Sequence, residues 1–128
     1  MTLASLLPGT RASPTIPEAL DVNTLFHLLR NQRRRETLHA LGERDETSFR
    51  ELAEAVASVE YDRPIEGIST TERKTVYVTL YQNHVPELED CGLVERDRDT
   101  GTVCLTPAGR QVVDVLADIE TRYVEGSA

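Results

Sequence analysis

The sequence predicts a mainly α-helical fold with a small β-hairpin (α+β), because two spacings of apolar residues follow one another along the chain. From about residue 18 to residue 91, apolar residues recur every three to five positions, as they do on the buried face of amphipathic helices. Over 93–106 the period changes to two on either side of Asp99-Thr100-Gly101, which is typical of two short strands joined by a turn. The 128 residues are enough for one domain and too few for a second large one.

Both ends of the chain are predicted to lie outside this domain. Residues 1–17 hold three of the six prolines and show no period, so we expect a flexible tail there. The domain should cover 18–125, and 126–128 should form a second short tail. Hydrophobic residues make up 39% of the chain and include no Trp and only two Phe, so the core should be small and aliphatic.

Two helices are expected first. Leucines after Pro17 predict a helix over 18–30, and Asn31-Gln32 then interrupts the apolar pattern. A second helix should follow and end at Gly42 as its C-cap. The next segment, GERDET, is polar and is predicted to be a loop.

The third helix is predicted from a capping box. Ser48 is a good N-cap, and Glu51 three residues later completes the pattern for a helix over 49–59. Residues 60–69 contain a proline and a glycine and are expected to form a loop.

A second capping box, Ser69 with Glu72, begins the longest helical pattern, over 70–91. Pro86 lies inside this pattern and removes one backbone donor. The helix should therefore kink or split near His84.

The hairpin and a last helix complete the pattern. Gly92 should cap the preceding helix, and strands are expected over 93–98 and 102–106. Thr106-Pro107, an N-cap followed by proline, predicts a helix over 107–124. This helix carries an apolar stripe that requires a partner surface. The stripe consists of Val112, Val113, Leu116, Ile119 and Tyr123.

Three helices followed by a hairpin, with one extra helix at each end, form the layout of a winged helix-turn-helix domain with extra N- and C-terminal helices. The segment LFHLLRNQRRRETLHAL resembles the opening of ArsR-like winged-helix regulators, and SFRELAEAVA resembles the first helix of a helix-turn-helix. The segment HVPELEDCGLVERDRDTGTVCLTPAGRQVV is similar to the recognition-helix end, wing and following helix of ArsR, MarR and PadR-type regulators. Its specific phrases lie at 88–94 and 105–109.

Over about residues 20–124 the chain looks most like a haloarchaeal winged-helix family of unassigned function. The resemblance implies a DNA-binding fold without identifying a ligand. One departure is the predicted loop over 60–69, which is longer than the usual turn of this motif and could shift the recognition helix.

The charge balance is unusual. Lys74 is the only lysine among 14 basic residues, and the formal net charge is −8. An acidic excess with almost no lysine suits a protein that stays dissolved in multimolar salt, where carboxylates hold water and salt screens their repulsion. The composition predicts a halophilic, archaeal protein, in which a negative charge does not argue against nucleic-acid binding. An ordinary acidic protein with biased codons is the alternative.

The expected location is cytoplasmic. No apolar run approaches the roughly 18–20 residues of a membrane span, and no basic segment precedes the short apolar stretch near the N-terminus. Cys91 and Cys104 are too few for a disulfide scaffold. We therefore expect no membrane association.

The first candidate site is the solvent side of the predicted recognition helix, 70–91. Its polar residues are types that contact base edges in the major groove: Arg to guanine, Asn and Gln to adenine, and Thr to either. Ordinary exposed polar residues are the alternative. The candidates are Arg73, Thr75, Thr79, Gln82 and Asn83.

The second candidate site is the wing, 94–106. Arg96 and Arg98 share one strand face and suit contact with phosphate or the minor groove. The acidic residues between them favour the alternative of an edge hairpin protected by charge.

Other polar residues are weaker candidates. One or two members of Arg33-Arg34-Arg35 could bind phosphate, and one is expected to pair with the acidic loop after Gly42. His84 and Cys91 share a helix face but lack metal-ligand spacing, so packing is the preferred interpretation and no metal or cofactor is expected. No phosphate-binding loop, dinucleotide glycine pattern or nucleophile elbow is present, so no enzyme activity is predicted.

These observations predict a sequence-specific transcriptional regulator that binds double-stranded DNA as a homodimer and reads a pseudo-palindromic site. The alternative is a winged-helix protein–protein interaction module with a protein partner and no DNA. The two terminal helices are expected to form the dimer interface. Its residues are Leu25, Leu29, Val112, Leu116, Ile119 and Tyr123.

Overall fold

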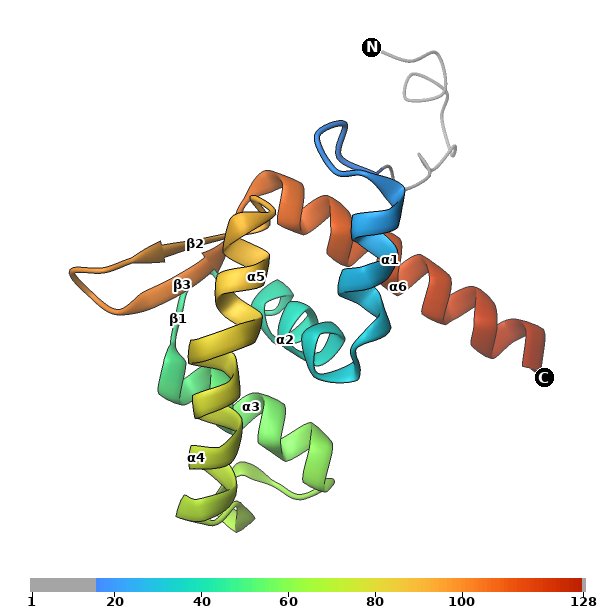
Figure 1. The fold of residues 1–128 in the computed structure, drawn as a ribbon. Helices are drawn as coiled ribbons and strands as arrows, with labels where there is room; N and C mark the ends of the chain where they lie inside the picture. Colours follow the sequence, from blue (N-terminus) through green and yellow to red (C-terminus); the bar gives the residue numbers. More distant parts are fainter. Residues whose placement is uncertain (1–15, 128) are drawn as a thin grey trace.

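The computed structural model describes residues 16–127. The first four elements are α1 (Val22–Arg30), α2 (Gln32–Gly42), β1 (Thr47–Ser48) and α3 (Phe49–Tyr61). A 3-10 turn η2 (Ile65–Gly67), α4 (Thr70–Thr79), a π-helical segment η3 (Leu80–His84) and α5 (Val85–Asp90) follow. Strands β2 (Val94–Asp97) and β3 (Thr102–Leu105) and the long α6 (Pro107–Ser127) complete the described chain (Figure 1). The predicted class, mainly α with a small antiparallel sheet, is confirmed.

The ends differ from the predicted boundaries. Most of the predicted N-terminal tail and the last residue of the chain lie outside the described residues. The first helix begins at Val22, four residues later than predicted, because Asp21 is its N-cap and the segment before it is a turn. The last helix extends to Ser127, so the predicted tail at 126–128 is helical over its first two residues.

The sheet has three strands in the order β1-β3-β2, all antiparallel. The hairpin β2–β3 was predicted. β1 was interpreted as part of a polar loop, because a strand of two residues has no period to detect. Thr47 is buried and pairs with Val103, so β1 ties the start of α3 to the hairpin.

The hairpin turn forms as its sequence predicts. A carboxylate oxygen of Asp97 accepts hydrogen bonds from the backbone N–H of Asp99 and Thr100, at 2.9 and 3.3 Å. Gly101 has a φ of 73°, in the left-handed region that favours glycine, and its N–H donates to the Asp97 carbonyl at 2.7 Å.

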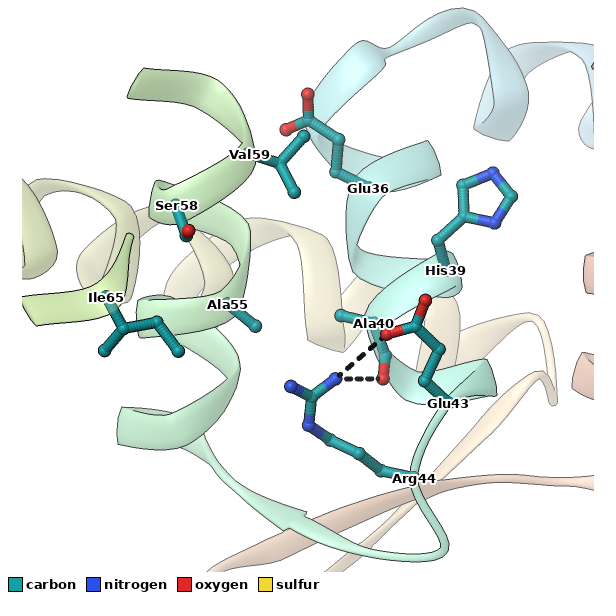
Figure 2. A pocket seen from close by; sticks show the side chains of 9 residues that line it. All are labelled: Glu36, His39, Ala40, Glu43, Arg44, Ala55, Ser58, Val59 and Ile65. Carbon is teal, nitrogen blue, oxygen red and sulfur yellow. Dashed lines mark hydrogen bonds and ion pairs between the residues drawn. The ribbon is translucent and has the colours of Figure 1, made fainter. Parts of the chain in front are cut away.

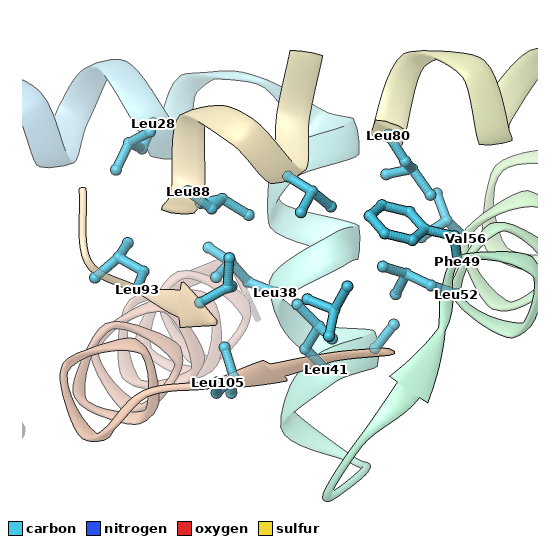
Figure 3. Close-up of a cluster of buried hydrophobic side chains, with 14 of the residues drawn as sticks. Leu28, Leu38, Leu41, Phe49, Leu52, Val56, Leu80, Leu88, Leu93 and Leu105 are labelled. Carbon is cyan, nitrogen blue, oxygen red and sulfur yellow. The ribbon is translucent and has the colours of Figure 1, made fainter. Parts of the chain in front are cut away.

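The core is aliphatic, as expected from the composition. Leucines from α1, α2, α3, α5 and the sheet meet around Leu38 of α2, and Phe49 is the one Phe or Tyr side chain buried among the described residues (Figure 3). Every α-helix of the described chain and both long strands contribute residues to this cluster.

The long predicted helix is divided as Pro86 requires. α4 begins at the Ser69–Glu72 capping box, in which both reciprocal hydrogen bonds are present. The chain then widens into the π-helical η3, where the N–H of Val85 donates to the carbonyl of Leu80. The π turn accommodates the missing N–H of Pro86, and the chain continues as α5. The other predicted capping box is half formed: Ser48 accepts from the Glu51 N–H, and its hydroxyl contacts the Glu51 carboxylate.

Two glycines mark close approaches of α6. Gly42 was predicted to be a C-cap, and this is wrong: it is the last residue of α2, and Glu43 is the cap. A Cβ at Gly42 would lie 3.1 Å from Val113, so glycine lets α2 pack closely on α6. A Cβ at Gly109 would lie only 2.0 Å from the Leu93 carbonyl oxygen, so glycine is required where α6 meets the base of the hairpin.

Candidate nucleic-acid interface

The candidate interface is built by three neighbouring parts of the fold. α4 packs across α3, and β2–β3 projects beside the junction of α4 and α5 (Figure 1). This order of helices and strands is compatible with a winged helix-turn-helix. The long predicted loop is shortened by η2, which begins after the left-handed residue Asp62 has ended α3.

The solvent side of α4 and η3 carries three of the predicted polar residues: Thr75, Gln82 and Asn83 are exposed. Thr79 is half-buried, and its hydroxyl donates to the Thr75 carbonyl at 3.1 Å. Lys74 is also exposed on this helix and was not among the predicted residues. The surface of this helix is thus polar, but fewer of the predicted residues are exposed on it than expected.

Arg73 does not lie on the solvent side as predicted. Its side chain is half-buried, and its guanidinium lies 3.6 Å from the carboxylate of Glu54 on α3. Position 73 follows the Glu72 capping residue and turns back toward α3, which the sequence could not show. Arg73 therefore joins α4 to α3.

The two wing arginines share a strand face as predicted, but their environments differ. The Arg98 side chain is 73% exposed, whereas that of Arg96 is 9% exposed, so the expectation that both are accessible is wrong for Arg96. The Arg96 guanidinium lies 5.0 Å from the ring centre of Phe49 and 5.2 Å from that of Tyr81. Cation–π attraction between these groups holds the wing against α3 and η3.

Glu89 of α5 is the counter-charge for the wing. One carboxylate oxygen lies 3.8 Å from Arg96, and the other lies 3.8 Å from Arg98. These distances are longer than a hydrogen bond, so the pairs are loose and shared. The Nε atom of Arg96 is buried and has no hydrogen-bond partner among the described residues.

A cleft of about 370 Å³ opens between the start of α3, the α4–η3 helix and the wing. The rings of Phe49 and Tyr81 meet edge to face with centres 5.1 Å apart, and Tyr77 lies nearly parallel to Tyr81 at 6.1 Å. We call this site the aromatic–arginine cleft. Its lining consists of Ser48, Phe49, Arg50, Tyr77, Tyr81, Arg96, Arg98 and Gly101.

Sequence reasoning missed this cleft. Of its lining residues, only Arg96 and Arg98 were predicted as site residues. The i, i+4 spacing of Tyr77 and Tyr81 was a usable signal, because it puts both rings on one helix face.

The arginine triplet joins helices. Arg33 donates two hydrogen bonds of 2.7 Å to Glu60 at the end of α3, and buried Arg34 pairs with Glu87 of α5. Arg35 donates to the carbonyls of Leu29 and Arg30. None of these pairs involves the acidic loop after Gly42, so that expectation is wrong. The loop is close in sequence, but the helices pack the triplet toward α1, α3 and α5.

His84 is buried, and Cys91 and Cys104 are half-buried. Burial, and secondarily the charge of Arg34, lowers the pKa of His84, which favours a neutral imidazole. Burial raises the pKa of the Cys91 and Cys104 thiols, which disfavours the reactive thiolate. No group of three or more His, Cys, Asp or Glu side chains among residues 16–127 could hold a metal ion.

A second hollow lies between α2 and α3 and shares no residue with the aromatic–arginine cleft. Ala40, Ala55, Val59 and Ile65 give it an apolar floor, and Arg44 closes one side by donating to the Ala40 carbonyl at 2.8 Å (Figure 2). Burial raises the pKa of Glu36 at its rim.

An apolar groove of about 770 Å³ lies between α1 and α6. Three predicted dimer residues, Leu25, Val112 and Leu116, are buried within the single chain, because α6 packs on the helical body, and they are wrong as accessible contacts. Leu29 is half-buried, whereas Ile119 and Tyr123 are exposed. Phe26, which is 64% exposed, was missed because it lies off the leucine stripe of α1.

No helix among residues 16–127 combines the length and the apolarity that a membrane span requires.

Comparison with known proteins identifies a family. The family DUF7344, described as a domain of unknown function, matches residues 26–104. The match begins within α1, ends in β3, and includes the whole aromatic–arginine cleft but not α6. No curated protein and no solved structure matches the chain. Because the match covers more than half of its residues, the chain belongs to the DUF7344 family.

Proposed function

We propose that the protein is a sequence-specific DNA-binding transcriptional regulator of the winged helix-turn-helix type, related in design to ArsR, MarR and PadR-type regulators. The observation that carries this proposal is the exposed polar surface of α4 and η3, where Lys74, Thr75, Gln82 and Asn83 lie on a helix held out by α3. A helix presented in this way fits the major groove, and these side chains suit base edges and phosphate.

The wing supports the same proposal through Arg98. Its side chain is largely exposed, and its loose contact with Glu89 leaves guanidinium donors available to a phosphate. Arg96 has a different role, because its stacked position fixes the angle between the wing and the helix.

A homodimer would place two such surfaces on one duplex. The groove between α1 and α6 leaves Phe26, Ile119 and Tyr123 exposed beside one another, and a second copy of the chain is the occupant that we propose. A two-fold axis through this groove would set two recognition helices against the halves of a pseudo-palindromic site.

Because the chain is acidic and has almost no lysine, the binding test should be done at high salt concentration. In the multimolar salt that the acidic surface suits, the gain from counterion release is small, so affinity must depend on base contacts and shape. The experiment is selection of bound duplexes from a random pool in about 2 M KCl. The proposal predicts enrichment of a two-fold symmetric motif.

Variants locate the binding surface. Gln82→Ala combined with Asn83→Ala should abolish the sequence preference, whereas Gln111→Ala, an exposed glutamine on α6, should leave it unchanged. Absence of any enriched motif, with folded protein in the same buffer, would refute the proposal.

The second candidate is a protein–protein interaction module. The pairing of both wing arginines with Glu89, and the exposed Val78 on the helix that would face DNA, favour it. Ile119→Asp distinguishes the candidates: a dimeric regulator should become monomeric and bind its duplex more weakly, whereas a module acting through the wing should keep its partner.

A further inference from the structure

The aromatic rings of the cleft are not explained by duplex recognition. Bases in a duplex offer their edges, because their faces are stacked on one another. Tyr81 is 48% exposed, and Tyr77 beside it is also exposed to the cleft. Two partly exposed tyrosine rings that line one cleft suit a ligand with a free planar face.

The rings are held in place before any ligand arrives. The planes of Tyr77 and Tyr81 differ by only 5°, and Phe49 supports Tyr81 from the core. Arg96 lies against both Phe49 and Tyr81. A ligand stacking here would lose little free energy to ordering of side chains.

Cationic groups surround the rings. Arg50 and Arg98 line the cleft with side chains that are 70% and 73% exposed. Arg50 contacts Glu54 at 3.2 Å, and Arg98 contacts Glu89 at 3.8 Å, so each keeps further donors for an anion. Three arginines thus meet at one cleft of a chain with a net charge of −8.

Arg96 adds an independent indication of a ligand. Its side chain is more than nine-tenths buried, it lines the cleft, and its Nε has no hydrogen-bond partner among the described residues. A buried donor without an acceptor is costly. A carbonyl or phosphate oxygen entering the cleft could supply that acceptor.

We propose that the aromatic–arginine cleft binds an unpaired nucleobase of a single-stranded nucleic acid. The base stacks on Tyr81 and Tyr77, and its flanking phosphates contact Arg50 and Arg98. Stacking platforms combined with cationic side chains are the general means of binding single strands, because every base has a π face. This inference does not depend on sequence-specific duplex binding.

The test uses the full chain and a deoxythymidine oligonucleotide of about eight residues, within the usual site size for such platforms. The oligonucleotide contains one 2-aminopurine, whose fluorescence is quenched when it stacks on an aromatic ring. Titration in about 2 M KCl should show saturable quenching, because stacking does not depend on counterion release.

Matched variants separate stacking from a structural role. Tyr81→Leu keeps an apolar side chain but removes the π face, and should weaken binding about tenfold or more. Tyr81→Phe should bind like the wild type. Tyr61→Leu is the control, because Tyr61 also has an arginine over its ring, Arg63 at 5.3 Å, but lies outside the cleft.

The results of this experiment can be distinguished from those that test duplex binding. Absence of quenching with the wild-type chain, or equal affinity in folded Tyr81→Leu and Tyr61→Leu, would overturn the single-strand proposal. If Tyr81→Leu does not fold, Tyr77→Leu and Arg98→Glu take its place, with the same expected loss. Gln82→Ala with Asn83→Ala should leave single-strand binding intact while removing duplex preference, so either proposal can fail alone.

Discussion

Two glutamates of α5, two residues apart, contact arginines in contrasting ways. Glu87 pairs closely with Arg34, which is buried and also donates to the His27 carbonyl at 3.1 Å. Glu89 is shared by Arg96 and Arg98 at 3.8 Å from each. The same pair of residue types therefore forms a close ion pair between helices at Arg34 and a loose, shared one on the wing, although Arg34, like Arg96, has a buried Nε without a hydrogen-bond partner among the described residues. The contrast teaches that arginine count alone does not locate a binding face, because the arginines of this chain differ in burial and in how closely their carboxylates approach.

The largest predicted effect is on stability, and it tests how the hairpin is attached to α6. Gly109→Ala would place a Cβ about 2.0 Å from the Leu93 carbonyl oxygen, so the hairpin or α6 must shift. We expect a loss of at least about 3 kcal/mol in the free energy of unfolding, measured by denaturant titration.

Gly67→Ala is the matched control. A Cβ there has no contact closer than 3.8 Å, so stability should change little. Equal stability of the two variants would show that backbone packing does not hold the wing.

The second prediction compares the buried Arg34, which pairs with Glu87, with the exposed Arg98 on the wing. Arg34→Met should lower the free energy of unfolding by about 2 kcal/mol, because a buried cation with two acceptors is lost while Glu87 stays half exposed. Arg98→Met should change it by less than about 0.5 kcal/mol. If chemical denaturation shows similar losses of unfolding free energy in the two variants, Arg34 and Arg98 do not differ in the way described.

One pH effect is expected from His84, which lies among the helices near Arg34. Burial and the charges of Arg34 and Arg33 lower the pKa of His84 in the folded chain. The unfolded chain then takes up a proton near the ordinary value of about 6.5 while the folded chain does not, so stability falls as pH decreases below that value. His84→Gln should show a shallower fall between about pH 6.5 and 5 in thermal melts. An unchanged slope would contradict this assignment.

The smallest effect on stability should accompany a gain in binding. Glu89→Gln removes the shared counter-charge of the wing, so nucleic-acid affinity should rise several-fold while stability changes by less than about 0.5 kcal/mol. Glu95→Gln, at an exposed position on the same hairpin, makes the same change in net charge. Equal gains in both variants would show that net charge, and not the shared pair, limits binding.

Local signals predicted much of the fold. Gly92 and Gly101 adopt positive φ values, Ser69–Glu72 forms its capping box, and the Thr106 hydroxyl caps α6 by accepting from the Gly109 N–H. Each of these depends on residues within a few positions of one another, so the sequence specifies them directly.

Long-range contacts limited the prediction of the site. The burial of Arg96 depends on Phe49, which is far away in the sequence, and β1 exists only because β3 pairs with it. The exposure of Phe26 depends on how α1 lies beside α6. Periodicity within one element contains no information about such neighbours, so the polar helix surface was partly predicted and the aromatic–arginine cleft was not.

The most direct test of the central claim is to map the DNA contact surface by amide chemical-shift changes on titration with the selected duplex in about 2 M KCl. We predict that the largest changes fall on residues 74–83 and on the hairpin, with small changes in α1, α2 and α6. Changes confined to the groove between α1 and α6, or none at saturating duplex, would contradict it.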